Sequence, residues 1–168
     1  MSYPLRNDAL TLYAITDRYW LNGRRLADVV ENVLKNGATF LQLREKEFSH
    51  EEMVQEAMEI KEIAARHRVP FVINDDIYAA KEIDADGVHI GQSDMEYQKA
   101  RQILGPDKII GISACTLEEA VAAEKAGADY IGVGAVFPTD TKADHIPVTF
   151  EELKQITDTV SIPVVAIG

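Results

Sequence analysis

The chain has 168 residues, of which 46% are hydrophobic and 27% are charged, and it carries a formal net charge of −11. This length suits one domain with a substantial core, and the composition is that of an ordinary soluble globular protein rather than a disordered or fibrous one. The acidic balance argues against a nucleic-acid-binding surface or an anchor for acidic membranes. It leaves open a local basic pocket for a phosphorylated small molecule.

The single cysteine, Cys115, cannot form an internal disulfide and offers no metal-ligand spacing. A reducing compartment is therefore expected. The opening residues lack the apolar core of a signal peptide, and no apolar run approaches the roughly 18–20 residues needed to span a bilayer. These features predict a cytoplasmic location and no membrane partner.

Strands and helices are predicted to alternate along the chain. The expected strands cover 11–17, 39–46, 70–75, 86–91, 108–114, 129–137 and 163–168. The expected helices cover 25–36, 50–67, 76–83, 95–104, 116–126 and 150–159. Strands separated by helices pair in parallel through right-handed crossovers. The fold class is therefore α/β, and the pattern predicts a (β/α)8 TIM barrel whose seventh strand ends the chain as given.

Three stretches repeat one loop chemistry, namely 36–44, 83–91 and 126–134. Each follows a helical pattern and turns through Ala-Thr or Ala-Asp into an apolar strand. Gly37 and Gly127 stand where two of the helices end, a position that favours a left-handed residue. Recurrence of one helix-to-strand loop favours a barrel of repeated units over an open sheet.

The last predicted strand, 163–168, has the β-branched composition of a buried strand. Residues 1–168 are expected to form a single TIM-barrel domain from which strand eight and its flanking helices are absent. The first and seventh strands would then have unpaired edges. We expect either that the native chain continues past Gly168 or that a homo-oligomer seals the gap.

The second predicted strand carries the most unusual polar residues. Side chains alternate along a strand, so Gln42, Arg44 and Lys46 share one face and point into the barrel. Because burying an unpaired charge is prohibitive, these cations require an anionic partner. The partner could be a carboxylate such as Glu45 or Asp17. A ligand such as phosphate or pyrophosphate is favoured.

Acidic residues follow the third and fourth strands, where the site of such a barrel lies. Asn74, Asp75 and Asp76 end the third strand, and Gln92 and Asp94 follow the fourth. Mg²⁺ typically takes one or two carboxylates, with waters and substrate phosphates as the other ligands. Asp75 and Asp94 could instead cap the following helices. The basic residues nearby favour a metal–pyrophosphate site.

The sixth strand places Gly132 and Gly134 on one face, which leaves space in the barrel. The long loop beyond it carries Thr139, Thr141 and Lys142, whose hydroxyls and ammonium group suit an anion. A loop of this length in a compact domain is more often functional than idle.

Ser113 ends the fifth strand and adds a hydroxyl at the same height, although it could instead cap the helix that starts near 116. His89 lies within a strand and is interpreted as a satisfied barrel histidine. Cys115 has no evident base partner, so it is not interpreted as a nucleophile.

The chain resembles the thiamine phosphate synthase family, which belongs with the thiazole tautomerases in one superfamily. Seven motifs carry the resemblance, in order and over nearly the whole chain: LYAITD, QLREK, VIND, DGVHIGQSDM, GISACT, ADYIGVGAVFPTDTK and PVVAIG. The resemblance implies a transferase of thiamine biosynthesis. It would join hydroxymethylpyrimidine pyrophosphate to hydroxyethylthiazole phosphate, release pyrophosphate and use Mg²⁺.

The resemblance also implies a role for each matching residue. The pyrimidine pyrophosphate would be held by Gln42, Arg44, Lys46 and Asn74. Ser113 would hydrogen-bond the pyrophosphate or the pyrimidine, Mg²⁺ would be bound by Asp75 and Asp94, and Gly168 would begin the thiazole-phosphate site. The phosphates would be engaged from a closing loop by Thr139, Thr141 and Lys142. The catalytic set would be Arg44, Lys46, Ser113 and Lys142.

The chain departs from the family pattern at two positions. Cys115 stands where family members commonly carry a histidine, and Ala143 stands where a second lysine is frequent. A related thiazole tautomerase is the nearest alternative, but it commonly carries the histidine that Cys115 replaces. A non-catalytic module that binds a phosphate ligand is the alternative from a different class.

Overall fold

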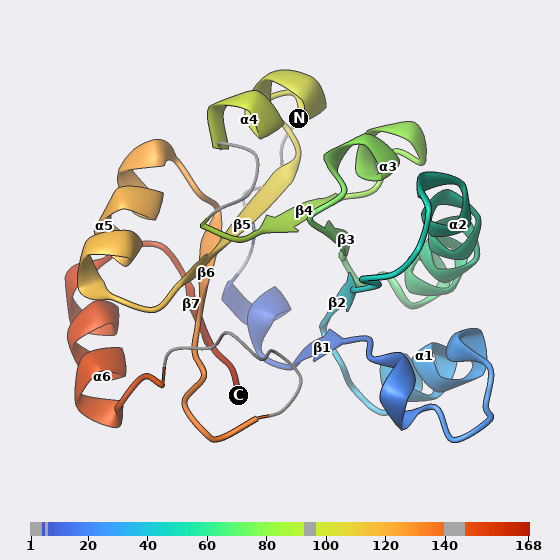
Figure 1. Ribbon diagram of the computed structural model, residues 1–168, viewed down its shortest axis with the longest axis horizontal. Helices are drawn as coiled ribbons and strands as arrows, with labels where there is room; N and C mark the ends of the chain where they lie inside the picture. The colour runs from blue at the N-terminus through green and yellow to red at the C-terminus, as the bar shows by residue number, and fades with distance from the viewer. Residues whose placement is uncertain (1–4, 6, 93–96, 140–146) are drawn as a thin grey trace.

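The computed structural model describes residues 5, 7–92, 97–139 and 147–168, and its strands lie inside an arc of helices that is open between the last helix and the first (Figure 1). The seven strands form one parallel sheet in the order of the chain. They are β1 (Tyr13–Ile15), β2 (Phe40–Leu43), β3 (Phe71–Asn74), β4 (Gly87–Ile90), β5 (Ile109–Ala114), β6 (Tyr130–Val133) and β7 (Val164–Ala166). The predicted α/β fold of the TIM-barrel type is confirmed.

Six α-helices connect successive strands in the described residues. They are α1 (Leu26–Lys35), α2 (His50–His67), α3 (Ile77–Glu82), α4 (Tyr97–Leu104), α5 (Leu117–Ala126) and α6 (Phe150–Thr159). Two short 3-10 helices, η1 (Asn7–Leu10) and η2 (Arg18–Trp20), precede and follow β1. None of the helices in these ranges is long and apolar enough to cross a membrane.

The three repeated helix-to-strand loops perform the same task in the structure. Each buries its alanine, and the polar residue that follows accepts a backbone N–H near the start of the preceding strand in the sheet. The pairs are Leu12 N with Thr39 Oγ1 at 2.9 Å, Phe71 N with Asp86 Oδ2 at 2.8 Å and Ile110 N with Asp129 Oδ2 at 2.7 Å. The repeat therefore ties neighbouring strands together at their amino-terminal ends.

Two apolar regions pack on the two faces of the sheet. Leu41 and Leu43 point outward and join the large core between the strands and the helices. Phe40, Val72 and Tyr130 form a smaller cluster inside the barrel. Residues of the N-terminal segment, including those of η1, pack against this inner cluster and close that end of the barrel.

The strands β1 and β7 stand at the two ends of the sheet. Val164 and Val165 of β7 are only half-buried and Ala166 is exposed, whereas the sequence predicts a buried strand. The difference arises because β7 pairs with β6 on one side and ends the sheet on the other.

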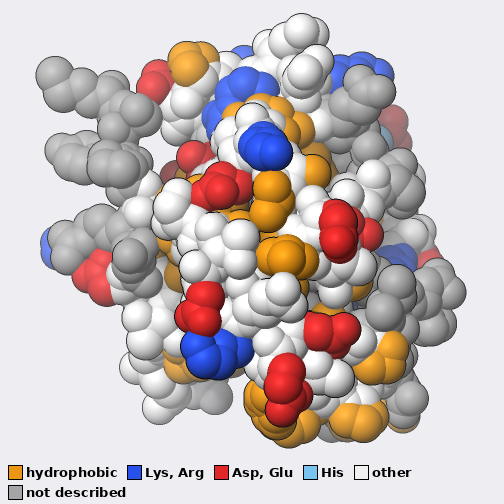
Figure 2. Space-filling model, turned by 90° about the vertical axis from the view of Figure 1, so that its left-hand side faces the viewer, with side chains coloured by type: hydrophobic (Ala, Val, Ile, Leu, Met, Phe, Trp, Pro, Cys, Tyr) orange, Lys and Arg blue, Asp and Glu red, His pale blue; other side chains and the backbone are white. Residues whose placement is uncertain are grey.

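The face over α5 and α6 is shown in Figure 2. Acidic, basic and apolar side chains are interspersed there, so the negative charge is not gathered into one patch on this face. The features that bear on chemistry lie instead where the strands end.

Candidate active site

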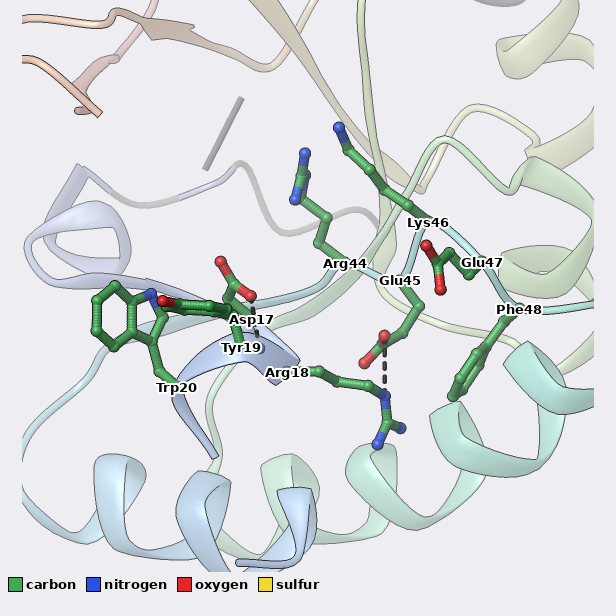
Figure 3. Close-up of a pocket in the computed structure, with 9 residues that line it drawn as sticks. All are labelled: Asp17, Arg18, Tyr19, Trp20, Arg44, Glu45, Lys46, Glu47 and Phe48. Atoms are coloured by element: carbon green, nitrogen blue, oxygen red, sulfur yellow. Dashed lines mark hydrogen bonds and ion pairs between the residues drawn. The ribbon is translucent and has the colours of Figure 1, made fainter. Parts of the chain in front are cut away.

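A pocket of about 560 Å³ opens at the carboxyl ends of β1 and β2 (Figure 3). Its walls come from the segment after β1, including η2, and from the segment after β2. The lining residues are Asp17, Arg18, Tyr19, Trp20, Arg44, Glu45, Lys46, Glu47 and Phe48.

Arg44 and Lys46 extend to the same side of this pocket, and the carboxylate of Glu45 turns the other way (Figure 3). Glu45 Oε2 pairs with Arg18 Nε at 3.0 Å, and Asp17 Oδ1 accepts a backbone N–H at 2.9 Å. Within the described residues, neither Arg44 nor Lys46 has a carboxylate at ion-pair distance. This side of the pocket can therefore bind an anionic group between the two cations.

The Arg18–Glu45 pair forms the wall beneath these cations. Arg18 also pairs with Glu56 at 3.1 Å and lies over the ring of Phe48, 4.6 Å from its centroid. The Glu45 side chain is only 6% exposed, and its burial raises the pKa of the carboxyl although Arg18 opposes the shift. Its Oε1 atom has no hydrogen-bond partner in the described part of the chain.

Gln42 lies deeper in the barrel than the two cations. Its side chain is 2% exposed, and its Nε2 donates to Tyr13 Oη at 2.7 Å. The predicted inward orientation of Gln42 is therefore correct, and its amide is already engaged by the barrel interior.

The three polar residues that end β3 have distinct environments. Asp76 caps α3, because its Oδ1 accepts the N–H of Ala79 at 2.8 Å. Asp75 is exposed, has a left-handed φ of 61° and donates its N–H to the carbonyl of His89 at 2.9 Å. The amide of Asn74 donates to the Asp75 carboxylate. The capping role that Asp75 could have had is thus filled by its neighbour.

A Mg²⁺ site requires oxygen ligands, which carboxylates, waters and phosphates supply. Across 5, 7–92, 97–139 and 147–168, no group of three or more His, Cys, Asp and Glu side chains is placed to hold a metal. Asp94 lies outside the described residues. An exposed carboxylate at a strand end suits a cation that takes one or two carboxylates with waters and phosphates. Asp75 therefore fits the part of one ligand.

Ser113 is half-buried near the end of β5, and its Oγ lies 3.0 Å from His89 Nε2. It does not cap the next helix, since Thr116 does so by accepting the N–H of Glu119 at 3.2 Å. His89 is 9% exposed, and its Nδ1 contacts the Tyr130 hydroxyl at 2.9 Å. The interpretation of His89 as a satisfied barrel histidine is confirmed.

The expected empty space at two glycines is not present. A Cβ atom at Gly132 would lie 3.1 Å from Cε1 of His89, and one at Gly134 would lie 2.1 Å from the carbonyl oxygen of Ile167. The prediction that these glycines leave room for a ligand is therefore wrong. The protein itself fills both positions, with an imidazole ring at one and backbone at the other.

The other predicted site residues are only partly covered by the structure. Thr139 is half-buried and follows β6. Gly168 has a φ of 115°, and a Cβ there would lie 2.7 Å from Cα of Ala135, so only glycine suits this position. Thr141 and Lys142, like Asp94, lie outside the described residues.

Two groups of aromatic residues near the site were not predicted from the sequence. Tyr13 and Tyr130 place hydroxyls inside the barrel, and strand alternation could have shown this, because a buried tyrosine hydroxyl needs a polar partner. Tyr19 and Trp20 line the pocket and are 79% and 63% exposed. They belong to η2, which has no signature in the sequence.

Proteins of one family match this chain in sequence and in structure. The family described as thiamine monophosphate synthase matches residues 12–168. A thiamine-phosphate synthase of Clostridium novyi is 54% identical over 94% of this chain and 78% of its own length. That of Clostridium acetobutylicum is 50% identical over 98% of this chain and 78% of its own length.

Among solved structures, a thiamine phosphate pyrophosphorylase from Pyrococcus furiosus matches with a TM-score of 0.87 and 40% identity. The match covers 96% of this chain and 76% of that one. The likeness thus extends through the strands and strand ends described above. The chain belongs to the thiamine monophosphate synthase family.

Proposed function

We propose that this chain is a thiamine-phosphate synthase. This transferase joins hydroxymethylpyrimidine pyrophosphate to hydroxyethylthiazole phosphate and releases pyrophosphate. The observation that carries the proposal is the pair of cations, Arg44 and Lys46, on a pocket at the strand ends without a carboxylate partner among the described residues. Relatives at about half identity carry the synthase name, which supports the proposal.

The proposed chemistry asks the protein to neutralise a leaving group. Pyrophosphate departs from the methylene carbon next to the pyrimidine ring, and the electron-rich aminopyrimidine stabilises the cation that remains. Arg44 and Lys46 offset the charge that grows on the pyrophosphate oxygens. Asn74 and Ser113 add hydrogen bonds to the same substrate, and Gln42 supports it from below. A pocket that excludes water protects the cation from hydrolysis.

A metal and a loop complete the proposed site. Asp75 and Asp94 would hold Mg²⁺, which when bound supplies further positive charge to the pyrophosphate. Thr139, Thr141 and Lys142 would contact the phosphates, and Gly168 would begin the site for the thiazole phosphate. We also propose a cytoplasmic location, because the single cysteine of the chain cannot form an internal disulfide.

The first test is formation of thiamine phosphate from the two substrates. We expect Arg44→Ala to lower kcat/KM by about a hundredfold or more, the typical cost of removing one preorganised charge-stabilising group. Arg66→Ala is the matched control, because Arg66 pairs with Glu31 on the surface at 2.8 Å and does not line the pocket. An active Arg44→Ala variant, or a wild type that makes no product, would refute the proposal.

The metal is tested by binding of inorganic pyrophosphate with and without Mg²⁺. We expect Asp75→Ala to abolish the Mg²⁺-dependent part of the affinity. Asp76→Ala should keep that part and lose only stability, because Asp76 caps α3. Equal effects of the two substitutions on metal-dependent binding would contradict the assignment. Pyrophosphate binding that needs no metal would favour the isomerase or the non-catalytic module.

A further inference from the structure

A continuous chain of hydrogen bonds crosses the barrel interior from Gln42 to Ser113. Gln42 Nε2 donates to Tyr13 Oη at 2.7 Å, and Tyr13 Oη lies 2.6 Å from Tyr130 Oη. Tyr130 Oη lies 2.9 Å from His89 Nδ1, and His89 Nε2 lies 3.0 Å from Ser113 Oγ. The two ends are proposed substrate contacts. The three residues between them have no role in the proposed function.

The direction of donation along this chain follows from its first member. The amide nitrogen of Gln42 can only donate, so Tyr13 Oη accepts there and turns its single hydrogen toward Tyr130. Tyr130 then donates to Nδ1 of His89. In the reverse order the Tyr13 hydrogen would have no acceptor among the described side chains, which is costly for a buried hydroxyl.

His89 determines in the same way which atom donates to Ser113, near the end of β5. Since His89 Nδ1 accepts a hydrogen bond, the ring hydrogen is on Nε2, which donates to Ser113 Oγ. The hydroxyl hydrogen of Ser113 is then left to donate to another group. The backbone carbonyl of Ser113 is engaged separately by Gln92 Nε2 at 2.7 Å. The half-buried hydroxyl can therefore serve an acceptor at the strand ends.

The barrel is built to accommodate these rings. A Cβ atom at Gly111 would lie 2.1 Å from Cζ of Tyr130, and one at Gly132 would lie 3.1 Å from Cε1 of His89. Burial raises the pKa of the Tyr130 hydroxyl well above its usual value, and burial likewise raises the pKa of Tyr13. Both hydroxyls therefore keep the hydrogens that these hydrogen bonds require.

We propose that Tyr130 and His89 are positioning residues that fix the Ser113 hydroxyl as a hydrogen-bond donor to the pyrophosphate of the substrate. The proposal rests on the proposed function for the identity of the anion. As the carbon–oxygen bond to pyrophosphate breaks, its electron pair stays with the departing oxygen. A hydroxyl already aimed at that oxygen stabilises the charge without rotating, and its own O–H bond stays intact.

The first test measures the His89 tautomer in the ligand-free chain by two-bond ¹H–¹⁵N correlation of its imidazole ring. We expect hydrogen on Nε2 and none on Nδ1 in the wild type. We expect Tyr130→Phe, which removes only the donor to Nδ1, to give a mixture of tautomers. Hydrogen on Nδ1 in the wild type, or an unchanged tautomer in Tyr130→Phe, would overturn the proposal. A loss of packing alone would not shift the tautomer.

The second test is a double-mutant cycle on the binding of inorganic pyrophosphate in the presence of Mg²⁺. Ser113→Ala should weaken binding about tenfold in the wild type, as expected for one hydrogen bond to a charged group. The factor should be smaller in Tyr130→Phe, because only the molecules with hydrogen on Nε2 of His89 then direct the Ser113 hydroxyl to the anion. In a Tyr97→Phe background the effect should stay near tenfold, because Tyr97 donates to Gly127 O at 2.7 Å, outside this chain of bonds. Equal effects in all three backgrounds would overturn the proposal.

A second pair of variants covers the case in which Tyr130→Phe does not fold. His89→Gln keeps an N–H donor for Ser113, whereas His89→Leu has none. We expect the Ser113→Ala effect to persist in His89→Gln and to vanish in His89→Leu, and the same effect in both would refute the proposal. Failure to make thiamine phosphate would refute the proposed function instead, since neither the tautomer nor pyrophosphate binding depends on turnover.

Discussion

Gly111 stands where the barrel interior has no room for a further carbon. Its absent Cβ would fall 2.1 Å from the ring of Tyr130, whereas at Gly132 the nearest atom is the edge of His89 at 3.1 Å. We expect Gly111→Ala to lower the free energy of unfolding by about 1–3 kcal/mol, the usual cost of overpacking a core. Gly132→Ala should cost less. Urea unfolding followed by circular dichroism measures both, and a larger loss for Gly132→Ala would contradict this explanation.

At the scale of single residues, the sequence indicates which side chains are polar. The structure shows which of them already have hydrogen-bond or ion-pair partners within the protein. Strand alternation alone predicts that Arg44 and Lys46 lie on one side, and both line the pocket. Which of Asp75 and Asp76 caps α3 could not be predicted, because it depends on a left-handed turn at Asp75. The ring that fills the space at Gly132 comes from another strand, so no local pattern shows it.

At the scale of the elements, His50 joins the start of α2 to α3. Its Nε2 lies 3.0 Å from Glu82 Oε2 and its Nδ1 lies 3.3 Å from Asp76 Oδ2. The hydrogen bond with Glu82, followed by that with Asp76, raises the pKa of His50 above its usual value. A raised folded-state pKa stabilises the protein below the unfolded value of about 6.5, and this stabilisation is lost as pH rises through the folded value.

We therefore expect the stability difference between the wild type and His50→Gln to be largest near pH 6. It should shrink as pH rises, because the histidine loses its charge in both states. Chemical unfolding measured across this pH range gives the difference directly. A constant difference at all pH values would show that the charge of His50 contributes nothing.

The boundaries of the helices were predictable because local chemistry sets them. The helices α2 and α6 span the predicted 50–67 and 150–159, and each begins with a capping box, at Ser49 and Thr149. The first strand is shorter than predicted, since η2 follows it closely. A single 3-10 turn has too few residues to show a period, so η1 and η2 could not be predicted.

For the molecule as a whole, the sheet has a protected middle and two edges. The strands β4 and β5 are largely buried, whereas β1 is half-buried throughout and β7 is partly exposed. We expect backbone amides of β1 and β7 to exchange hydrogen faster than those of β4 and β5. Hydrogen exchange read by NMR or mass spectrometry measures this. Equal protection of all four strands would show that the edges are covered by another pairing.

The barrel fold could be predicted from the alternation of strands and helices. The hydrogen bonds inside the barrel could not. Tyr13, His89 and Tyr130 are far apart in sequence, and they meet only because parallel pairing brings their strands into register. Neither composition nor local spacing predicts the contacts between these three side chains. Predicting them needs the complete register of the sheet.

The backbone hydrogen bonds that Thr39, Asp86 and Asp129 accept lie at the starts of the strands, while the pocket lies where strands end. These three bonds therefore lie at the opposite end of the strands from the pocket. Residues that line the pocket can be randomised in a library without altering these three bonds. A barrel organised in this way is a tolerant starting scaffold for laboratory evolution toward other phosphorylated substrates.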